Sequence, residues 1–173
     1  ISIFHINSYL HEIRPLLASK GKSKGILFLN CHGSKLSRMS IWSILKNNVI
    51  RALKGPQFEY FLNTSQKEFF SKDYKITNLT DRMGMRLEGK VLKNTVSTNI
   101  RSEGITKGAI QVPADGQPII LLTDHPTIGG YPKIANVISA DYHLLSQKIP
   151  GEKILFQNVE LHEADQLYRE HLN

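Results

Sequence analysis

The sequence has little cysteine and no long apolar run. Its only cysteine, Cys31, cannot form a disulfide within the chain, which is typical of a reducing compartment. No stretch of 18 or more apolar residues occurs, so no membrane-spanning helix is predicted. The first residues lack a basic segment before an apolar one, so we expect no signal peptide. These absences favour a cytoplasmic protein without membrane contact.

Several catalytic and ligand-binding motifs are also absent. The seven histidines are scattered, and no C-x-x-C, H-x-H or H-E-x-x-H spacing occurs, so we expect no metal site. The segment "TIGGYPK" has a glycine pair and a lysine but is no Walker loop, so ATP would not bind this chain through one. No G-x-S-x-G motif occurs, and Cys31 has no obvious base beside it.

The net charge of +7 is unevenly distributed. Residues 1–54 hold nine Lys or Arg and one acid, Glu12, whereas residues 55–173 hold 13 basic and 14 acidic residues. Nucleic-acid-binding proteins usually carry their basic side chains on the folded reading surface. Because the better-patterned part of this chain is nearly neutral, we expect no nucleic-acid binding.

The secondary-structure signals are strong only after Gly55. Ser65 and Glu68 have capping-box spacing, which predicts a short helix starting at Ser65. Ser139 is expected to cap another short helix, and a third is predicted over 161–172 with Leu161, Ala164, Leu167, Tyr168 and Leu172 on one face. Residues 40–54 permit an amphipathic helix, although "NNVIRAL" could equally enter a strand. The segment "GILFLN" (25–30) could be a strand.

Strands are predicted from alternating apolar residues between Gly/Pro turns. They are "YKITNLT" (74–80), "MRLEGKVL" (85–92), "GAIQV" (108–112), "QPIILLTD" (117–124), "KIANVI" (133–138) and "PGEKILFQNV" (150–159). Many short strands with few short helices indicate a mainly β domain closed as a barrel or sandwich.

Polar residues gather in segments beside these strands. They are "TDRMGMRLEG" with Arg82 and Arg86, "RSEG" with Glu103, "GAIQVPADGQPI" with Gln111, Asp115 and Gln117, and "DHPTIGGYPK" with Thr127, Gly129, Gly130, Tyr131 and Lys133. Each residue could also serve only a turn or the core. We predict that the segments "DRMGMR", "QVPADGQP" and "DHPTIGGYPK" converge on one site, where the glycines let backbone approach a ligand closely.

These segments carry a family resemblance. From about Val49 to the C-terminus, "LKGPQFEYF", "DRMGMRLEG" and "SEGITKGAIQVPADGQPIILLTDHPTIGGYPKIANVISADYHLL" closely resemble the allophanate hydrolase subunit 2 family, also called carboxyltransferase subdomain A and B. The resemblance implies a cyclophilin-like β-barrel and, in complete members, two such subdomains. Residues 49–173 resemble subdomain B. Residues 1–48 match poorly and would be a remnant of subdomain A, so the chain resembles a truncated member.

The resemblance implies three functions. PxpC-type members imply ATP-dependent opening of the lactam 5-oxoproline to glutamate, with ATP as co-substrate of a complex that contains PxpA and PxpB subunits. KipA-type members imply a non-catalytic role through binding a KipI-like partner. Urea amidolyase relatives imply carboxyl transfer from biotin, which would sit on another chain because no biotin-attachment motif occurs here. The absence of a first subdomain also predicts an exposed apolar face and self-association.

The amide chemistry shared by the enzymatic members suggests roles for the clustered residues. Charge that develops on an amide oxygen calls for fixed donors, and an anionic substrate group calls for a cation. We expect catalytic roles for Glu103, Asp115 and Lys133, with Glu103 or Asp115 handling a proton. We expect substrate-binding roles for Arg82, Arg86, Gln111, Gln117, Thr127, Gly129, Gly130 and Tyr131.

Overall fold

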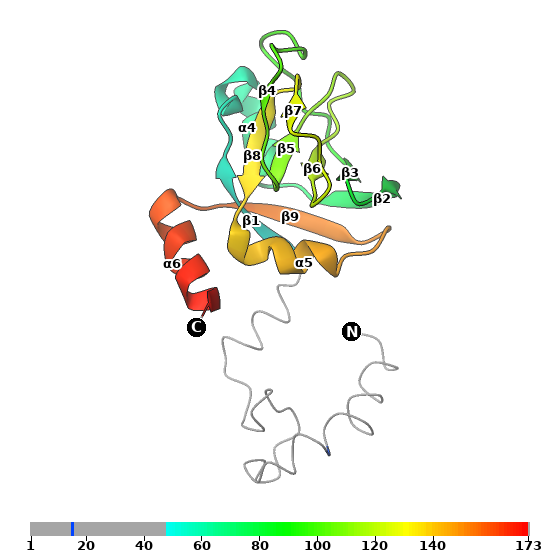
Figure 1. Cartoon of the computed structure of the whole chain (residues 1–173). Coiled ribbons are helices and arrows are strands. Elements are labelled where there is room, and N and C mark those ends of the chain that lie inside the picture. Colours follow the sequence, from blue (N-terminus) through cyan, green and yellow to red (C-terminus); the bar gives the residue numbers. More distant parts are fainter. Residues whose placement is uncertain (1–14, 16–47, 173) are drawn as a thin grey trace. The chain divides into compact units, whose positions relative to one another are not determined.

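The structure is a computed structural model that describes Pro15 and residues 48–172 (Figure 1). By its internal contacts the chain divides into two units, Ile1–Lys46 and Asn47–Asn173, and only the second is described below. Cys31, the expected strand over 25–30 and the expected helix over 40–47 lie outside the described residues. The domain boundary between residues 48 and 49 stays a prediction.

Seven strands form a closed barrel (Figure 1). In order around the barrel they are β1 (Val49–Lys54), β8 (Lys133–Val137), β5 (Ala109–Gln111), β6 (Ile119–Leu121), β3 (Gly84–Glu88), β2 (Tyr74–Thr80) and β9 (Lys153–Asn158). The pairing of β1 with β9 is parallel, and the other pairings are antiparallel. A mainly β chain with a cyclophilin-like barrel is therefore confirmed.

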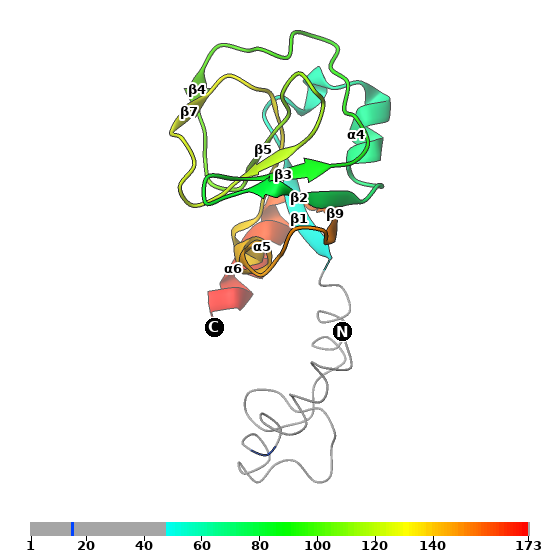
Figure 2. The same ribbon diagram turned by 90° about the vertical axis from the view of Figure 1, so that its right-hand side faces the viewer.

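Two short strands lie outside the barrel. β4 (Glu103–Gly104) and β7 (Ile128–Gly129) form a separate two-stranded sheet, which lies to one side of the barrel strands in Figure 2. The helices are η2 (Phe58–Tyr60), α4 (Asn63–Phe69), η3 (Ser139–Asp141), α5 (Tyr142–Ser146) and α6 (Leu161–Leu172). None of the helices in the described part is long and apolar enough to cross a membrane.

The barrel strands follow the alternation of the sequence. In β3, Met85 and Leu87 are buried while Arg86 is exposed, because successive side chains of a strand point to opposite faces. Aromatic rings fill one part of the interior. Phe69 of α4 stacks on Phe156 of β9 with ring centroids 4.6 Å apart, so α4 is held to the barrel by a side chain that is fully buried.

The helix boundaries differ from those predicted. α4 begins at Asn63 rather than at Ser65, and the Ser65 hydroxyl instead accepts a hydrogen bond from the backbone N–H of Lys93 at 2.9 Å. Ser139 does not cap an α-helix either, because it is the first residue of η3 and α5 begins three residues later. The partner of Ser65 is 28 residues away in the sequence, so the capping pattern alone does not reveal it. The ambiguous "NNVIRAL" enters strand β1.

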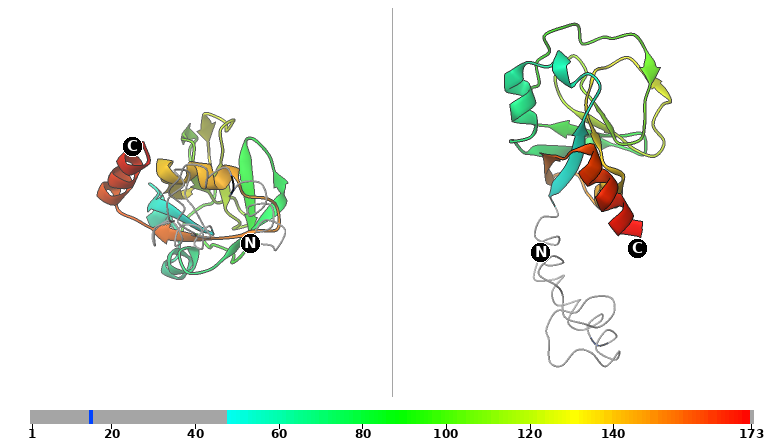
Figure 3. Two further views of the ribbon diagram at one scale, coloured as in Figure 1. Left: turned by 90° about the horizontal axis from the view of Figure 1, so that it is seen from below. Right: turned by 90° about the vertical axis from the view of Figure 1, so that its left-hand side faces the viewer.

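α6 lies along the outside of the barrel beside β1 (Figure 3). Its expected apolar face is only partly used. Ala164 is buried against Ile138 and Val159, whereas Leu161 is 72% exposed and Tyr168 is 42% exposed. The helix is confirmed, but the stripe that packs is narrower than the sequence pattern predicted.

A buried carboxylate fastens β1 to the η3 segment. Asp141 is fully buried and accepts hydrogen bonds from the Arg51 backbone N–H at 2.8 Å and from the Arg51 Nε at 3.1 Å. The Arg51 Nη2 also reaches the second oxygen. These contacts raise the pKa of Arg51, the hydrogen bond to Asp141 being the largest cause. The pair links two segments 90 residues apart.

We expect Asp141→Ala to lower the free energy of unfolding by about 2–4 kcal/mol, because it leaves a half-buried guanidinium and a backbone N–H without their acceptor. Urea unfolding measures this change. Asp165→Ala is the control, since Asp165 pairs with Arg169 on the exposed face of α6 and its loss should cost less than about 1 kcal/mol. Equal losses in both variants would contradict the role given to Asp141.

Candidate functional site

The site lies on the outer face of the barrel wall. Gln111 of β5 pairs with Lys133 of β8, while the preceding Ile110 pairs with Ala135. Ile110 and Ala135 fill the barrel interior. Gln111 directly follows Ile110 in β5, so its side chain points to the opposite, outer face. In β8 the register shifts between Ala135 and Lys133, and the Lys133 ammonium reaches Glu103 of the β4–β7 sheet outside the barrel, so Lys133 lies on the outer face as well.

The β4–β7 sheet covers this part of the wall. Ile105, which follows β4, packs on Ala109 and Leu121 outside the main core. Glu103 pairs with Gly129, and a Cβ on Gly129 would lie 2.7 Å from Gln111 Nε2. The β7 backbone therefore rests directly on the carboxamide of Gln111, and a side chain at position 129 would have to displace that carboxamide.

Lys133 is buried beneath this cover and paired with an acid. Its side chain is 7% exposed, and its ammonium contacts Oε1 of Glu103, whose side chain is 43% exposed. A buried ammonium is costly unless a counter-charge and hydrogen bonds surround it. Glu103 supplies that charge from the solvent side.

Gln57, which the sequence indicates only as part of a turn, completes the pair. Its Nε2 donates to Glu103 Oε1 at 2.7 Å, and its Oε1 accepts from the backbone N–H of Lys133 at 3.1 Å. Gln57 is 8% exposed. Its loop is tight against β8, since a Cβ on Gly55 would overlap the carbonyl oxygen of Lys133. In the sequence, the only indication that Gln57 belongs to the site is its position two residues after Gly55, and this indication is weak.

The Lys133 ammonium sets the charge state of Glu103. Its hydrogen bond is the main cause that holds the pKa of Glu103 below the ordinary value of 4.5, with a smaller contribution from Gln57. Glu103 therefore stays a carboxylate at neutral pH. Weakening the contact with Lys133 would raise the proton affinity of Glu103.

Gln111 brings an unused donor to the same place. Its side-chain Nε2 is buried and makes no hydrogen bond with the described part of the chain. Most buried polar groups are paired, and an exception calls for an explanation such as a missing ligand. We call Gln57, Glu103, Gln111 and Lys133 the Lys133 cluster.

Thr127, Gly130 and Tyr131 hold or flank the cover. The carbonyl oxygen of Thr127 accepts from Ile105 N–H at 3.1 Å, and that of Gly130 accepts from Ile100 N–H at 2.8 Å. Tyr131 is 40% exposed beside them. Two of the three segments that were expected to converge thus meet in the cluster, through Gln111 and through Gly129 and Lys133.

The third segment stands apart from the cluster. Arg86 lies in the same cross-strand row as Gln111, with Ile119 between them, so it is about 10 Å away at the usual strand spacing. Arg82 instead forms an ion pair with Asp124 at 2.8 Å. That pair borders a separate cavity of about 300 Å³ floored by Leu121 and Leu145.

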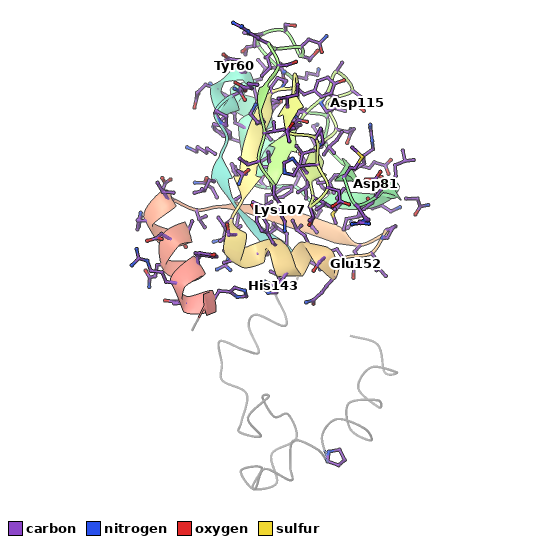
Figure 4. All side chains as sticks on the ribbon, in the orientation of Figure 1. Tyr60, Asp81, Lys107, Asp115, His143 and Glu152 are labelled. Atoms are coloured by element: carbon purple, nitrogen blue, oxygen red, sulfur yellow. The ribbon has the colours of Figure 1, made fainter. Side chains whose placement is uncertain are left out.

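Asp115 and Gln117 make the contacts of a turn. Asp115 accepts from the Gln117 backbone N–H at 3.0 Å, and the Gln117 side chain bonds both backbone groups of Gly89. Figure 4 shows Asp115 in the loop beyond the strands, and it shows Asp81 at the β2–β3 turn. Asp81 accepts from two backbone N–H groups there. The catalytic role expected for Asp115 stays a prediction, as do the substrate-binding roles expected for Gln117, Arg82 and Arg86.

Comparison with known proteins gives a consistent picture. The family model described as "Carboxyltransferase domain, subdomain A and B" matches residues 18–158. The chain is 40% identical to the C subunit of the Escherichia coli 5-oxoprolinase over 75% of its length and 42% of that protein. It is 41% identical to the protein of the same name from Haemophilus influenzae over 77% and 43%. The chain thus spans less than half the length of these curated relatives.

Two further similarities are more partial. The structure of the Kluyveromyces lactis urea amidolyase superposes with a TM-score of 0.68 at 27% identity, over 71% of this chain and 8% of that one. A stretch of 50 residues is 42% identical to the tyrosine recombinase XerD of Staphylococcus aureus, which is 29% of this chain and 17% of that protein. The second match is too short to assign a family.

The Glu103 contact predicts a pH dependence of stability. A carboxylate whose pKa is lowered on folding stabilises the protein above its unfolded pKa, and this stabilisation is lost as the pH falls through the lower folded pKa. We expect wild type to be more stable than Glu103→Gln at pH 7 and the difference to shrink below pH 4.5. Urea unfolding of both proteins from about pH 7 to about pH 3 measures it. A difference that is constant over this range would contradict the contact.

Gly129→Ala should displace the Gln111 carboxamide without unfolding the protein. The new Cβ meets the ends of two side chains, Gln111 Nε2 at 2.7 Å and Ile105 Cδ1 at 3.2 Å. Because such ends can shift, we expect a loss of stability of about 1 kcal/mol with a clear shift of the Gln111 side-chain NMR signals. Gly104→Ala, on the paired strand, is the control because a Cβ there meets no atom within 4 Å. Equal Gln111 shifts in both variants would show that β7 does not rest on Gln111.

Proposed function

This chain belongs to the family of carboxyltransferase domains, subdomain A and B, and on that premise we propose that it works in a 5-oxoprolinase that opens a cyclic amide. The identity of 40% to a protein named as the C subunit of 5-oxoprolinase supports this function. The observation that carries it is the Lys133 cluster, in which a buried cation and an unused amide donor lie beside a carboxylate.

The cluster suits the chemistry of a lactam. A nucleophile that attacks the lactam carbon drives negative charge onto the carbonyl oxygen, and fixed donors in a dry site stabilise that charge most effectively. In our proposal, Lys133 and Gln111 supply these donors. Glu103 takes or returns the proton exchanged with the ring nitrogen, which requires that substrate weaken its contact with Lys133.

Resonance makes an amide a poor electrophile. ATP used by the whole complex would therefore activate the lactam. The sequence holds no Walker loop, so PxpA- and PxpB-like subunits are the proposed partners that supply ATP binding and the remaining active-site groups. The chain covers 42% of its E. coli relative. A complete active site is therefore proposed only for the assembly, in the cytoplasm, and not for this chain alone.

Carboxyl transfer is the second candidate function. It is favoured by the superposition on the urea amidolyase structure. The same donors would then stabilise charge on a urea oxygen, and biotin would be carried by another chain. Avidin, which sequesters biotin, separates the two functions because only carboxyl transfer depends on biotin.

The proposed function is tested by co-expressing the chain with PxpA- and PxpB-like subunits and measuring the ATP-dependent release of glutamate from 5-oxoproline. We expect Lys133→Met to lower the rate by a factor of about 100–1,000, as for the loss of one oxyanion donor. Lys90→Met is the control, because Lys90 is an exposed lysine in a surface ion pair. No release above that of the partner subunits alone would overturn the proposed function.

A further inference from the structure

Three buried side chains of the Lys133 cluster carry N–H donors on neighbouring parts of the barrel wall. Lys133 and Gln57 both reach Oε1 of Glu103, and Gln111 Nε2 is without a partner in the described part of the chain. All three residues are more than nine-tenths buried. Donors that converge around a buried cation are the usual composition of a site for a carboxylate.

Glu103 is the only exposed member of the cluster. Its side chain is 43% exposed, so its carboxylate lies between the buried donors and the solvent. It is carried by a strand of two residues whose ladder consists of the pairs Glu103–Gly129 and Gly104–Ile128. Because this sheet is so short and lies outside the barrel, separating its two strands costs less free energy than opening the barrel.

Glu103 does not use all of the donors. A carboxylate has two oxygens and about four acceptor positions, yet both recorded donors reach the same oxygen and Gln111 Nε2 reaches neither. A carboxylate that entered more deeply could bond Lys133, Gln57 and Gln111 together. Glu103 therefore satisfies fewer of these donors than a small-molecule carboxylate could.

We propose that the Lys133 cluster is a carboxylate-binding site that the chain's own Glu103 occupies, and that a small-molecule carboxylate displaces Glu103 to bind there. The ligand must be an anion, because departure of Glu103 would otherwise leave a buried ammonium without a counter-charge. On the proposed function the carboxylate is that of the lactam acid, and Lys133, with three N–H donors, and Gln111, with two, serve both this carboxylate and the lactam oxygen. The site itself is argued from the contacts alone.

The test is chemical rescue of Glu103→Ala in the whole chain. Thermal unfolding is followed in sodium acetate and in sodium chloride at equal ionic strength. We expect acetate at about ten times its Kd to raise the Tm of the variant by about 3–5 °C over chloride, and to bind it at least tenfold more tightly than wild type. The double variant Glu103→Ala/Lys133→Met is the control, and it should not respond.

An equal Tm of Glu103→Ala in the two salts, or an equal response of the double variant, would overturn the proposal. If Glu103→Ala does not fold, the Gln111 side-chain NMR signals of wild type are titrated with acetate. Their specific shift supports the proposal, and no shift at molar acetate overturns it.

Two ligands separate this proposal from the proposed function. 5-Oxoproline should rescue Glu103→Ala, whereas 2-pyrrolidinone, the same lactam without the carboxylate, should not. Rescue without glutamate release by the assembled complex would leave the carboxylate site standing and remove the enzymatic function. Glutamate release without rescue would overturn only the carboxylate site.

Discussion

The burial of the Lys133 ammonium is the constraint on which the candidate site depends. A cation that is only 7% exposed needs an anion, and Glu103 supplies one from a strand that is not part of the barrel. This contact ties the β4–β7 sheet to the barrel wall, and Gln57 is buried where it bonds the same carboxylate. The barrel provides the wall, and the charge pair fastens the β4–β7 sheet to it.

The same constraint connects structure to chemistry. Glu103 is held as a carboxylate because Lys133 lowers its pKa, so its proton affinity rises when a ligand competes for Lys133. A substrate that carries its own carboxylate would thereby turn Glu103 from a counter-ion into a base. Binding and activation would then be the same event, so the energy of binding would contribute directly to the chemical step.

Much of the fold could be predicted from the sequence. In segments such as "MRLEGKVL", the alternation of apolar and polar residues indicates which side chains are buried without knowledge of distant partners. The segment "DHPTIGGYPK" contains Gly129 and Lys133, which lie in or beside the Lys133 cluster, and the roles expected for them stay predictions. Gln57 could not be found, because its partner Lys133 is 76 residues away and a G-P-Q sequence indicates only a turn. The buried role of Asp141 was missed for the same reason, since its partner Arg51 is 90 residues away.

The central claim is that a ligand carboxylate replaces Glu103 on Lys133. The most direct measurement is the pKa of Glu103, followed by NMR of its side-chain carboxyl carbon in wild type, without ligand and with saturating 5-oxoproline. We expect a pKa below 4.5 without ligand and a rise toward the ordinary value when ligand is bound. A pKa that stays lowered at saturation would show that Glu103 never leaves Lys133, and would contradict the claim.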